Sequence, residues 1–549
     1  MNSLPRVAYF CMEYGLHEDL AIYAGGLGIL AGDILKAAKD LNKPMVGIGI
    51  LWAEGYTYQR LDDHGWPYDA FPPLQRDGLE DTGVIIHVEL RGDVVPVKVW
   101  KTERYGNVPL YLLDTDVPNS SYGWITRRLY GGSDYDRVAQ EIVLGVGGVR
   151  VLRALNIPVD VYHFNEGHAV FAGIELIREK MEQRQMSFDQ AWKKTIEECV
   201  FTTHTPVMAG NESHDHGLLR ELGAYGPLNY EQMKALGGDP FAMTVAGLRL
   251  SHVANGVAKL HGKTARTMWD DVCNRAPIVD ITNGVHTDTW QDAEIRKAYY
   301  SGVGLWEAHV RAKKRLIQEV KEQTGVQLDP DVLLIGFARR AAPYKRSDLI
   351  FHRPEVIEPL LEDRQLQLVF SGKAHPMDET GKRIISNLAK VTRRHPDTVV
   401  FLENYNMRIG RLMTAGSDVW LNNPRRPLEA SGTSGMKAAM NGVLNFSILD
   451  GWWPEGCIHG VNGWQFGGGY EGPGQTEHDV ASLYEVLLKE VLPTYYEDPA
   501  RWQAMMRASI DMSIERFSAA RMVQEYYNLL YWPQTTVRKV QEAKELAVT

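Results

Sequence analysis

The sequence predicts an α/β protein built from two doubly wound domains, and three observations support this prediction. Short apolar runs rich in β-forming residues alternate with longer amphipathic stretches, which is typical of parallel sheets covered by helices. These runs fall into two series, separated by a charged helical stretch. The length of 549 residues also exceeds what one hydrophobic core usually organises. Ligands of such folds bind beyond the carboxyl ends of the strands, so we expect a cleft between the two halves.

Each predicted element follows from its local pattern. The first series of strands is expected at Arg6–Cys11, Pro44–Ile50, Val84–Glu89, Pro96–Trp100, Leu110–Asp114, Val159–Phe164, Cys199–Thr203 and Ile278–Thr282. The second series is expected at Leu333–Ala338, Gln367–Ser371, Thr398–Leu402, Val419–Asn422 and Val443–Ile448. Amphipathic spacing predicts helices that include Asp136–Ala154, Ser187–Glu198 and Trp306–Thr324.

The charged stretch Trp306–Thr324, followed by Gly325 and Pro330, is interpreted as the bridge between the halves. We therefore expect one domain over residues 1–310 and a second over residues 311–500. The amphipathic tail, residues 501–549, is expected to pack back on the first domain.

Composition narrows the functional class. A net charge of −10 argues against a broad nucleic-acid surface, and we expect no nucleic-acid partner. The four cysteines are scattered without metal-type spacing, which favours a reducing compartment. The N-terminus has no secretory pattern, and no run of about 18 apolar residues predicts a membrane span. The sequence thus predicts a cytoplasmic protein with no membrane partner.

The segment Glu429–Lys437 is a loop of small residues that runs into a helix expected from Met436 to Asn441, with Lys437 in its first turn. Small residues before a helix N-terminus expose backbone N–H groups, which favour an anion. A lysine nearby can form a Schiff base with an aldehyde cofactor that also carries a phosphate, and pyridoxal phosphate has both groups. Taken alone, the pattern fits an ordinary loop with a surface lysine equally well.

Two further segments are candidate anion sites. Phe337–Arg346 follows a predicted strand and carries four cations, although a solvated basic turn is the competing interpretation. Tyr23–Gly28 precedes a helical pattern, and its glycines allow close backbone approach to a phosphate. The run Gly26–Ala31 fits a loose dinucleotide fingerprint, but no strand leads directly into it, so we do not interpret it as a nicotinamide or flavin site.

Polar loops follow three predicted strands, at Asn165–His168, Thr203–Pro206 and Thr282–His286. Their Asn, His, Glu and Thr side chains can donate to and accept from hydroxyl groups. Because carboxyl ends of parallel strands meet at one sheet edge, these loops are compatible with a sugar-binding cleft.

Several motifs resemble the α-glucan (glycogen, starch, maltodextrin) phosphorylases, and the N-terminal region is similar to their short bacterial and archaeal branch. EASGTSGMKAAMNG resembles the family's pyridoxal-phosphate lysine motif, and FARRAAPYKR resembles its phosphate-binding stretch. The other matches, spread in order along the chain, are AYFCMEYGLHEDLAIYAGGLGILAGD, NEGH, FTTHTP, SHVANGVAKLHG, TNGVHTDTW and FLENYN. The resemblance implies a GT-B fold, with two Rossmann-like domains facing a central cleft. It also implies a retaining, reversible phosphorolysis of α-1,4-glucan non-reducing ends by inorganic phosphate to α-glucose 1-phosphate.

The resemblance also assigns roles by position. Pyridoxal phosphate would be held by Lys437, Thr433, Ser434, Arg339, Tyr405 and Trp290, with its phosphate relaying a proton to the substrate phosphate. The substrate phosphate would meet Arg340, Lys345 and the backbone of Gly26, and the glucosyl unit would meet Leu27, Asn283, His204, Glu429, Ser431 and Gly432. The catalytic set would be Lys437, Arg340, Lys345, Arg339, His204 and Glu429, with no metal required.

Alternatives remain at this level. A cofactor-free GT-B transferase that uses a nucleotide sugar would carry similar arginines but would not need Lys437. A related α-glucoside phosphorylase with short acceptors, a non-catalytic glucan-binding protein and a pyridoxal enzyme of amino-acid metabolism are weaker alternatives. Longer family members carry an extra segment before the AYFCMEYG-like region, so we expect no allosteric control by nucleotide or phosphorylation. A homo-oligomer, the glucan length and the physiological direction stay open.

Overall fold

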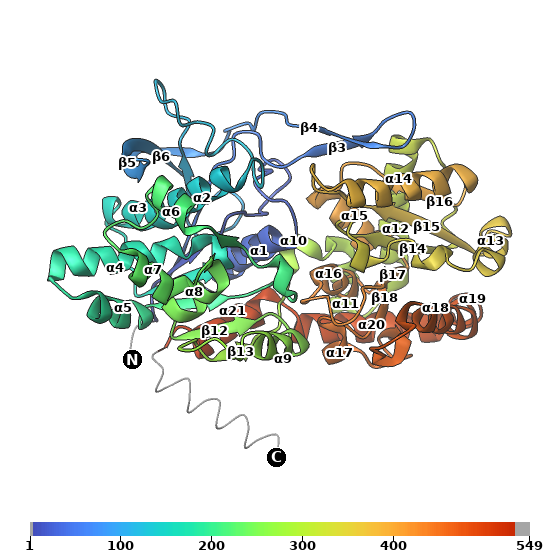
Figure 1. Ribbon diagram of the computed structural model, residues 1–549. Coiled ribbons are helices and arrows are strands. Elements are labelled where there is room, and N and C mark those ends of the chain that lie inside the picture. Colours follow the sequence, from blue (N-terminus) through green and yellow to red (C-terminus); the bar gives the residue numbers. More distant parts are fainter. Residues whose placement is uncertain (1–3, 533–549) are drawn as a thin grey trace, which may run out of the picture. The chain divides into compact units, whose positions relative to one another are not determined.

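The computed structural model describes residues 4–532, which divide into two compact units (Figure 1). Unit 1 comprises the chain up to Tyr56, Phe71–Thr282 and the chain from Ala519 onward. Unit 2 comprises Thr57–Ala70 and Asn283–Ser518. Each unit is built on its own α/β sheet, as the alternation of apolar runs and amphipathic stretches predicts.

Unit 1 is organised by a nine-stranded sheet in which the first strand, β1 (Val7–Phe10), lies between β2 and β8. Strands β13, β12, β9, β8, β1, β2 and β7 pair in parallel, and β6 and β5 extend one edge in antiparallel fashion. The chain therefore winds outward in two directions from β1, which creates a switch point between β1 and β8. The remaining bounds are β2 (Met45–Ile50), β5 (Glu80–Leu90), β6 (Asp93–Thr102), β7 (Leu110–Asp114), β8 (Val161–Asn165), β9 (Cys199–Thr202), β12 (Val253–Gly256) and β13 (Ile278–Asp280).

Helices cover this sheet, and a short ribbon, β10 (Ser213–His214) with β11 (Phe241–Ala242), pairs beside them. One predicted helix, Asp136–Ala154, is formed as α2 (Asp134–Ile142), a π-helical turn at Val143–Gly147 and α3 (Gly148–Ala154). The other helices of unit 1 are α1 (Gly26–Asp40), α4 (Phe171–Arg184), α5 (Phe188–Ile196), α6 (His216–Leu222), α7 (Tyr230–Gly237), α8 (Met243–Leu250), α9 (Lys259–Met268) and α21 (Ala519–Leu529).

Unit 2 is organised by a six-stranded sheet in the order β16-β15-β14-β17-β18-β19, in which every pair is parallel. This is the strand order 3-2-1-4-5-6 of a Rossmann sheet, and its switch point lies between β14 and β17. The strands are β14 (Leu333–Ala338), β15 (Leu366–Ser371), β16 (Val399–Leu402), β17 (Val419–Asn422), β18 (Leu444–Ile448) and β19 (Gly463–Phe466). A hairpin of β3 (Tyr58–Leu61) and β4 (Pro67–Ala70) also belongs to this unit.

The helices of unit 2 connect these strands and cover the sheet (Figure 1). They are α10 (Thr287–Trp290), α11 (Ala293–Ser301), α12 (Leu305–Thr324), α13 (Pro354–Glu362), α14 (Glu379–Arg394), α15 (Met407–Gly416), α16 (Thr433–Met440), α17 (Trp453–Gly456), α18 (Gln475–Val486), α19 (Leu492–Glu497) and α20 (Pro499–Arg516).

The expected domain boundary at residue 310 differs from the structure, because it falls inside α12. This helix does not bridge the halves: it packs on α15, and its buried His309 and Lys313 both contact Asp418 of unit 2. The chain instead passes from unit 1 to unit 2 at Thr282/Asn283.

The expected tail, residues 501–549, is divided between the units. Helix α20 packs on α16 in unit 2, whereas α21 packs on α1 and adds Tyr526 and Tyr527 to the core of unit 1. Residues 533–549 of the expected tail lie outside the described residues.

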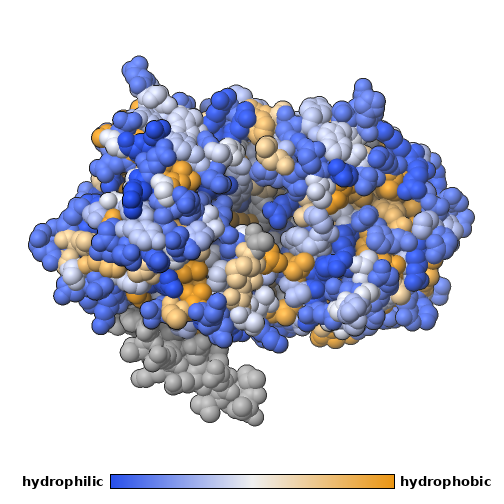
Figure 2. Space-filling model, in the orientation of Figure 1, coloured by the Kyte–Doolittle hydropathy of each residue, from blue (hydrophilic) through white to orange (hydrophobic). Residues whose placement is uncertain are grey.

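Within residues 4–532, no helix has the length and apolar character needed to span a membrane. On the face shown in Figure 2 hydrophilic residues predominate, with smaller apolar areas among them.

Candidate functional site

The switch point of unit 2 is organised by Arg339, the residue that follows β14. Its Nη1 donates to Asn422 Oδ1, at the end of β17, over 3.0 Å, and to Ser434 Oγ over 2.8 Å. Ser434 stands in the first turn of α16. One guanidinium thus links the carboxyl ends of the two central strands to a helix N-terminus, where anions are favoured.

Helix α16 begins at Thr433, so the expected start at Met436 is corrected, and Lys437 stands in the second turn. Gly432 precedes the helix with φ 86°, a left-handed conformation that suits glycine. No side chain caps the first turn, whose N–H groups have no partner within the helix itself. The earlier start places Thr433 and Ser434 on the helix itself, so their amides are among the N–H groups of its first turn.

Lys437 is buried, and its Nζ lies 3.6 Å from the centroid of the Trp290 ring. Trp290 ends α10, and the Asn441 side chain donates to its carbonyl over 2.8 Å. Tyr405 lies nearby: a Cβ added at Gly410 of α15 would lie 2.8 Å from Tyr405 Oη and 3.6 Å from Trp290 Cζ3. Burial raises the pKa of Tyr405 to about 12, so the phenol stays protonated. The structure therefore brings together the lysine and both predicted aromatic rings.

Glu429 forms ion pairs with both Arg339 and Lys345, and all three side chains are largely buried. Burial alone would raise the pKa of Glu429, but the two cations hold it below its ordinary value. Glu429 is therefore ionised at neutral pH and can accept hydrogen bonds from hydroxyl groups. These ion pairs place the basic run beside the Glu429 end of the small-residue loop.

A small pocket lies beside these groups, and Asp450, which the sequence interpretation missed, is part of its wall. Burial raises the pKa of Asp450 to about 7. Ser431 is buried in the same wall, and its Oγ has no hydrogen-bond partner among the described residues. The pocket is lined by Arg339, Asn422, Pro424, Glu429, Ser431, Gly432, Ser447, Asp450 and Trp452.

Two predicted residues of unit 2, Arg340 and Asn283, do not line this pocket. Arg340 is exposed, and its side chain forms no hydrogen bond or ion pair with the residues that the structure describes. Asn283 is buried in the segment that follows β13, and it falls in unit 2 rather than with the β13 strand of unit 1.

In unit 1 the glycine segment is shaped by Glu13, which lies beyond the end of β1. Glu13 Oε2 accepts the N–H groups of Ala24 and Gly25 over 2.7 and 3.1 Å, and Tyr130 donates to its other oxygen over 2.7 Å. Helix α1 then begins at Gly26. A Cβ added at Gly26 would meet no atom within 4 Å, which leaves room for a ligand to approach this backbone. Gly26 and Leu27 therefore lie in the first turn of α1, whereas the sequence predicts them in the loop before the helix.

His204, also in unit 1, is tied to the loop that follows β8. Its backbone N–H donates to Glu166 Oε2 over 2.8 Å, and its ring Nε2 lies 2.6 Å from Asn165 Oδ1. Burial lowers the pKa of His204 to about 3, so the ring is neutral and is no general acid near pH 7. Burial also raises the pKa of Glu166 to about 7, a titratable group that the NEGH motif contained but the sequence interpretation did not single out.

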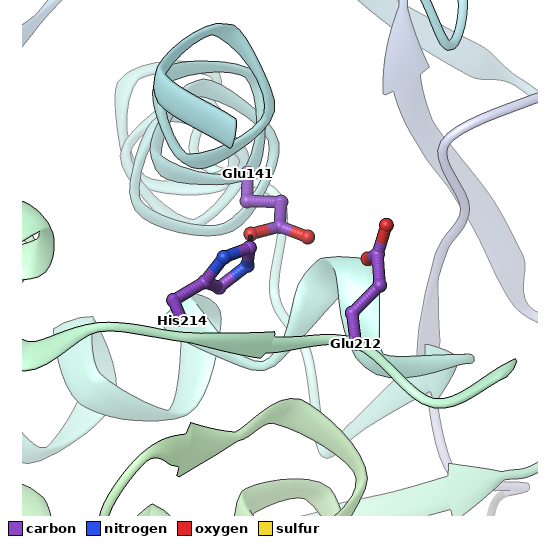
Figure 3. Close-up of side chains that lie close together, drawn as sticks. All are labelled: Glu141, Glu212 and His214. Carbon is purple, nitrogen blue, oxygen red and sulfur yellow. Dashed lines mark hydrogen bonds and ion pairs between the residues drawn. The ribbon is translucent and has the colours of Figure 1, made fainter. Parts of the chain in front are cut away.

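A second cluster in unit 1 joins residues that are distant in sequence, which is why no metal-type spacing was visible (Figure 3). Glu141 on α2 lies 2.9 Å from Nε2 of His214 on β10, and its other oxygen is directed toward Glu212. The ligand atoms of these three residues lie within 4.8 Å of one another, a geometry that could hold a cation. However, Arg137 lies 3.2 Å from Glu212, and burial raises the pKa of Glu141 well above its ordinary value, so a protonated Glu141 accounts for this cluster without a cation.

Each unit is built on a Rossmann-type sheet, and in unit 2 a buried lysine and two more cations lie near a helix N-terminus at the switch point. This arrangement is typical of proteins that bind phosphorylated ligands. Residues 303–453 match the model of the carbohydrate phosphorylase family. The chain is 40% identical to the maltodextrin phosphorylase of Thermococcus litoralis, over 96% of this chain and 70% of that protein. It is 37% identical to the glycogen phosphorylase of Mycobacterium tuberculosis, over 100% of this chain and 74% of that protein. For the glycogen phosphorylase of Aquifex aeolicus the identity is 36%, over 96% and 86% of the two chains. The chain belongs to the carbohydrate phosphorylase family, and its two α/β units are those of a GT-B fold.

Proposed function

We propose that this protein is a retaining α-glucan phosphorylase, which transfers glucosyl units from the non-reducing ends of α-1,4-glucans to inorganic phosphate, reversibly, to give α-glucose 1-phosphate. Lys437 carries the proposal, because it is buried against Trp290 in the second turn of a helix whose first turn is joined to Arg339. The relatives named glycogen and maltodextrin phosphorylases support the substrate class. The four unpaired cysteines support a reducing, cytoplasmic compartment.

The residues around Lys437 fit pyridoxal phosphate. An uncapped helix start and the Arg339 guanidinium supply donors for phosphate oxygens, and the Trp290 ring lies against the lysine. Lys437 would anchor the cofactor, while the amides of Thr433 and Ser434, together with Arg339, would hold its phosphate. Tyr405 and Trp290 would pack against its ring. When bound, the cofactor supplies a phosphate group that exchanges a proton beside the substrate phosphate.

The chain's own groups supply charge and orientation. Arg340, Lys345 and the backbone of Gly26 would hold the substrate phosphate, whose charge repels any second phosphate nearby. Arg339, Arg340 and Lys345 would offset this repulsion. Arg339 and Lys345 are largely buried, and in such surroundings electrostatic stabilisation of an oxocarbenium-like state is strong. Ionised Glu429 would accept hydrogen bonds from hydroxyl groups of the glucosyl unit. The other glucosyl contacts would come from Leu27, Asn283, His204, Ser431 and Gly432.

The test is cofactor content and activity of Lys437→Ala. Wild type is expected to absorb as a pyridoxal-phosphate protein and to form glucose 1-phosphate from maltodextrin and phosphate, and the variant is expected to lose both. Lys489→Ala, at an exposed lysine of unit 2, is the matched control and should retain both. A wild type that lacks cofactor absorbance and consumes a nucleotide sugar would contradict the proposal. If wild type forms glucose 1-phosphate, its rates across a ladder of glucans and disaccharides define the preferred acceptor length.

A further inference from the structure

The turn after β18, Asp450-Gly451-Trp452, forms hydrogen bonds and a close contact with the backbone of the segment Glu429–Ser431. Asp450 Oδ2 accepts the N–H of Glu429 over 2.9 Å, and the N–H of Trp452 donates to the carbonyl of Ser431 over 3.0 Å. Gly451 has φ 57°, and a Cβ added there would lie 2.2 Å from the Ser431 carbonyl oxygen. Only glycine permits this approach, so the turn and the segment are held together closely.

Both carboxyl oxygens of Asp450 act as acceptors. Oδ1 accepts the N–H of Gly451 over 2.8 Å, while Oδ2 accepts that of Glu429. Only the ionised carboxylate offers full acceptor capacity at both oxygens, because a protonated carboxyl group turns one of them into a hydroxyl donor. Protonation of Asp450 therefore weakens one of the two backbone contacts.

We propose that Asp450 is a positioning residue, whose ionised carboxylate fixes the backbone of Glu429 so that the Glu429 side chain meets both the cations and the glucosyl unit. This inference rests on the proposed function, because it takes Glu429 as the sugar-contacting group. The Glu429 carboxylate pairs with Arg339 and Lys345, and Asp450 accepts a hydrogen bond from the Glu429 backbone N–H. A shift of about 1 Å in such a group can reduce turnover by about a hundredfold.

The surroundings of Asp450 set the pH at which its hydrogen bond from the Glu429 backbone weakens. Burial raises its pKa to about 7, and the nearby Glu429 charge adds to the rise. The two backbone N–H donors and the Arg426 charge lower the pKa of Asp450. The Asp450 charge also interacts electrostatically with Arg346. We therefore expect turnover to fall on the acid side of neutrality, as Asp450 takes up a proton and the Glu429 backbone is released.

The test is the pH profile of kcat, and of KM for phosphate, in wild type, Asp450→Asn and Asp450→Glu. In Asp450→Asn the amide nitrogen meets a backbone N–H, so we expect kcat to fall roughly 10–100-fold, with cofactor content and KM for phosphate little changed. The acid limb near pH 7 should also disappear. Asp450→Glu keeps a titrating carboxylate and should restore an acid limb, and it decides the question if the Asn variant does not fold. Asp397→Asn, at an exposed aspartate of unit 2, should match wild type.

Different results overturn different claims. If wild type forms glucose 1-phosphate and Asp450→Asn keeps both the wild-type kcat and the acid limb, the positioning role is wrong and the proposed function stands. The positioning role also fails if Asp450→Asn loses cofactor, because the residue would then act through the cofactor site. If wild type forms no glucose 1-phosphate, both claims fall.

Discussion

At Glu429, burial and charge act in opposite directions on one carboxyl group. Burial favours the neutral acid, yet Arg339 and Lys345 keep the pKa below its ordinary value. Asp450 is the converse case, because its neighbours do not outweigh burial. Two carboxyl groups joined by one hydrogen bond to the backbone are thus expected to titrate far apart, which is typical of functional sites.

Arg339 and Arg340 are adjacent in sequence but have different surroundings, so their variants should separate two functions. Arg339→Ala removes bonds to Ser434 and Asn422, each a charge-assisted contact of about 1.5–3 kcal/mol. We expect its cofactor content to fall, measured by absorbance after dialysis. Arg340→Ala, the matched control, should keep the cofactor and raise KM for phosphate. Loss of cofactor in Arg340→Ala alone would mean that the two phosphate roles are interchanged.

At the scale of elements, α12 is attached to β17 through a buried charge cluster. Lys313 Nζ lies 2.6 Å from Asp418 Oδ2, and His309 Nε2 lies 2.8 Å from Oδ1. Burial would raise the pKa of Asp418, but Lys313 and His309 hold it below its ordinary value. This cluster explains why a helix whose charged surface suggested a linker belongs to the core of unit 2.

Lys313→Met should destabilise the protein, because it leaves Asp418 buried without its cation. Losing one partner of a buried pair costs about 3–5 kcal/mol in the free energy of unfolding. The loss is measurable by urea denaturation, with Lys314→Met, at an exposed position on the same helix, as control. Equal stability of the two variants would show that the pair contributes little.

The Glu141–Glu212–His214 cluster predicts how the stability of the protein depends on pH. Burial raises the folded-state pKa of Glu141 well above its ordinary value, so folding favours the protonated acid. Its unfavourable effect on stability therefore begins as pH rises above the unfolded pKa of about 4.3 and grows toward the folded pKa. Glu141→Gln should gain stability relative to wild type between pH 5 and pH 8, as measured by thermal unfolding. A difference independent of pH would contradict a protonated Glu141, and stabilisation of wild type by added Zn²⁺ would indicate a cation instead.

At the scale of the whole molecule, the sequence predicted most central strands because fully buried parallel strands form continuous apolar runs. It missed β12 and β19, whose short sequences contain Asn or Gly and are buried only through their neighbours. In β12, for instance, Asn255 accepts a hydrogen bond from Thr202 of β9, which no local pattern reveals. The domain boundary was misplaced because the sequence of α12 does not distinguish its buried His309 and Lys313 from the exposed charged residues around them.

The same limit applies to the site. Arg339, Lys345, Glu429 and Lys437 stand in two motifs at strand ends, so their proximity could be predicted from the sequence. Asp450 and Glu166 could not be singled out, because their shifted pKa values arise from burial among distant segments. An aspartate followed by glycine at a strand end is the signal that could have drawn attention to Asp450.

The central claim is that Lys437 anchors pyridoxal phosphate, and one measurement tests it most directly. Borohydride reduction of the purified protein, followed by proteolysis and mass spectrometry, identifies the lysine to which a cofactor is fixed. We predict a pyridoxyl-phosphate mass increase on the peptide that contains Lys437 and on no other. The absence of any such increase in the reduced protein, or its location on Lys345 or Lys373, would contradict the account.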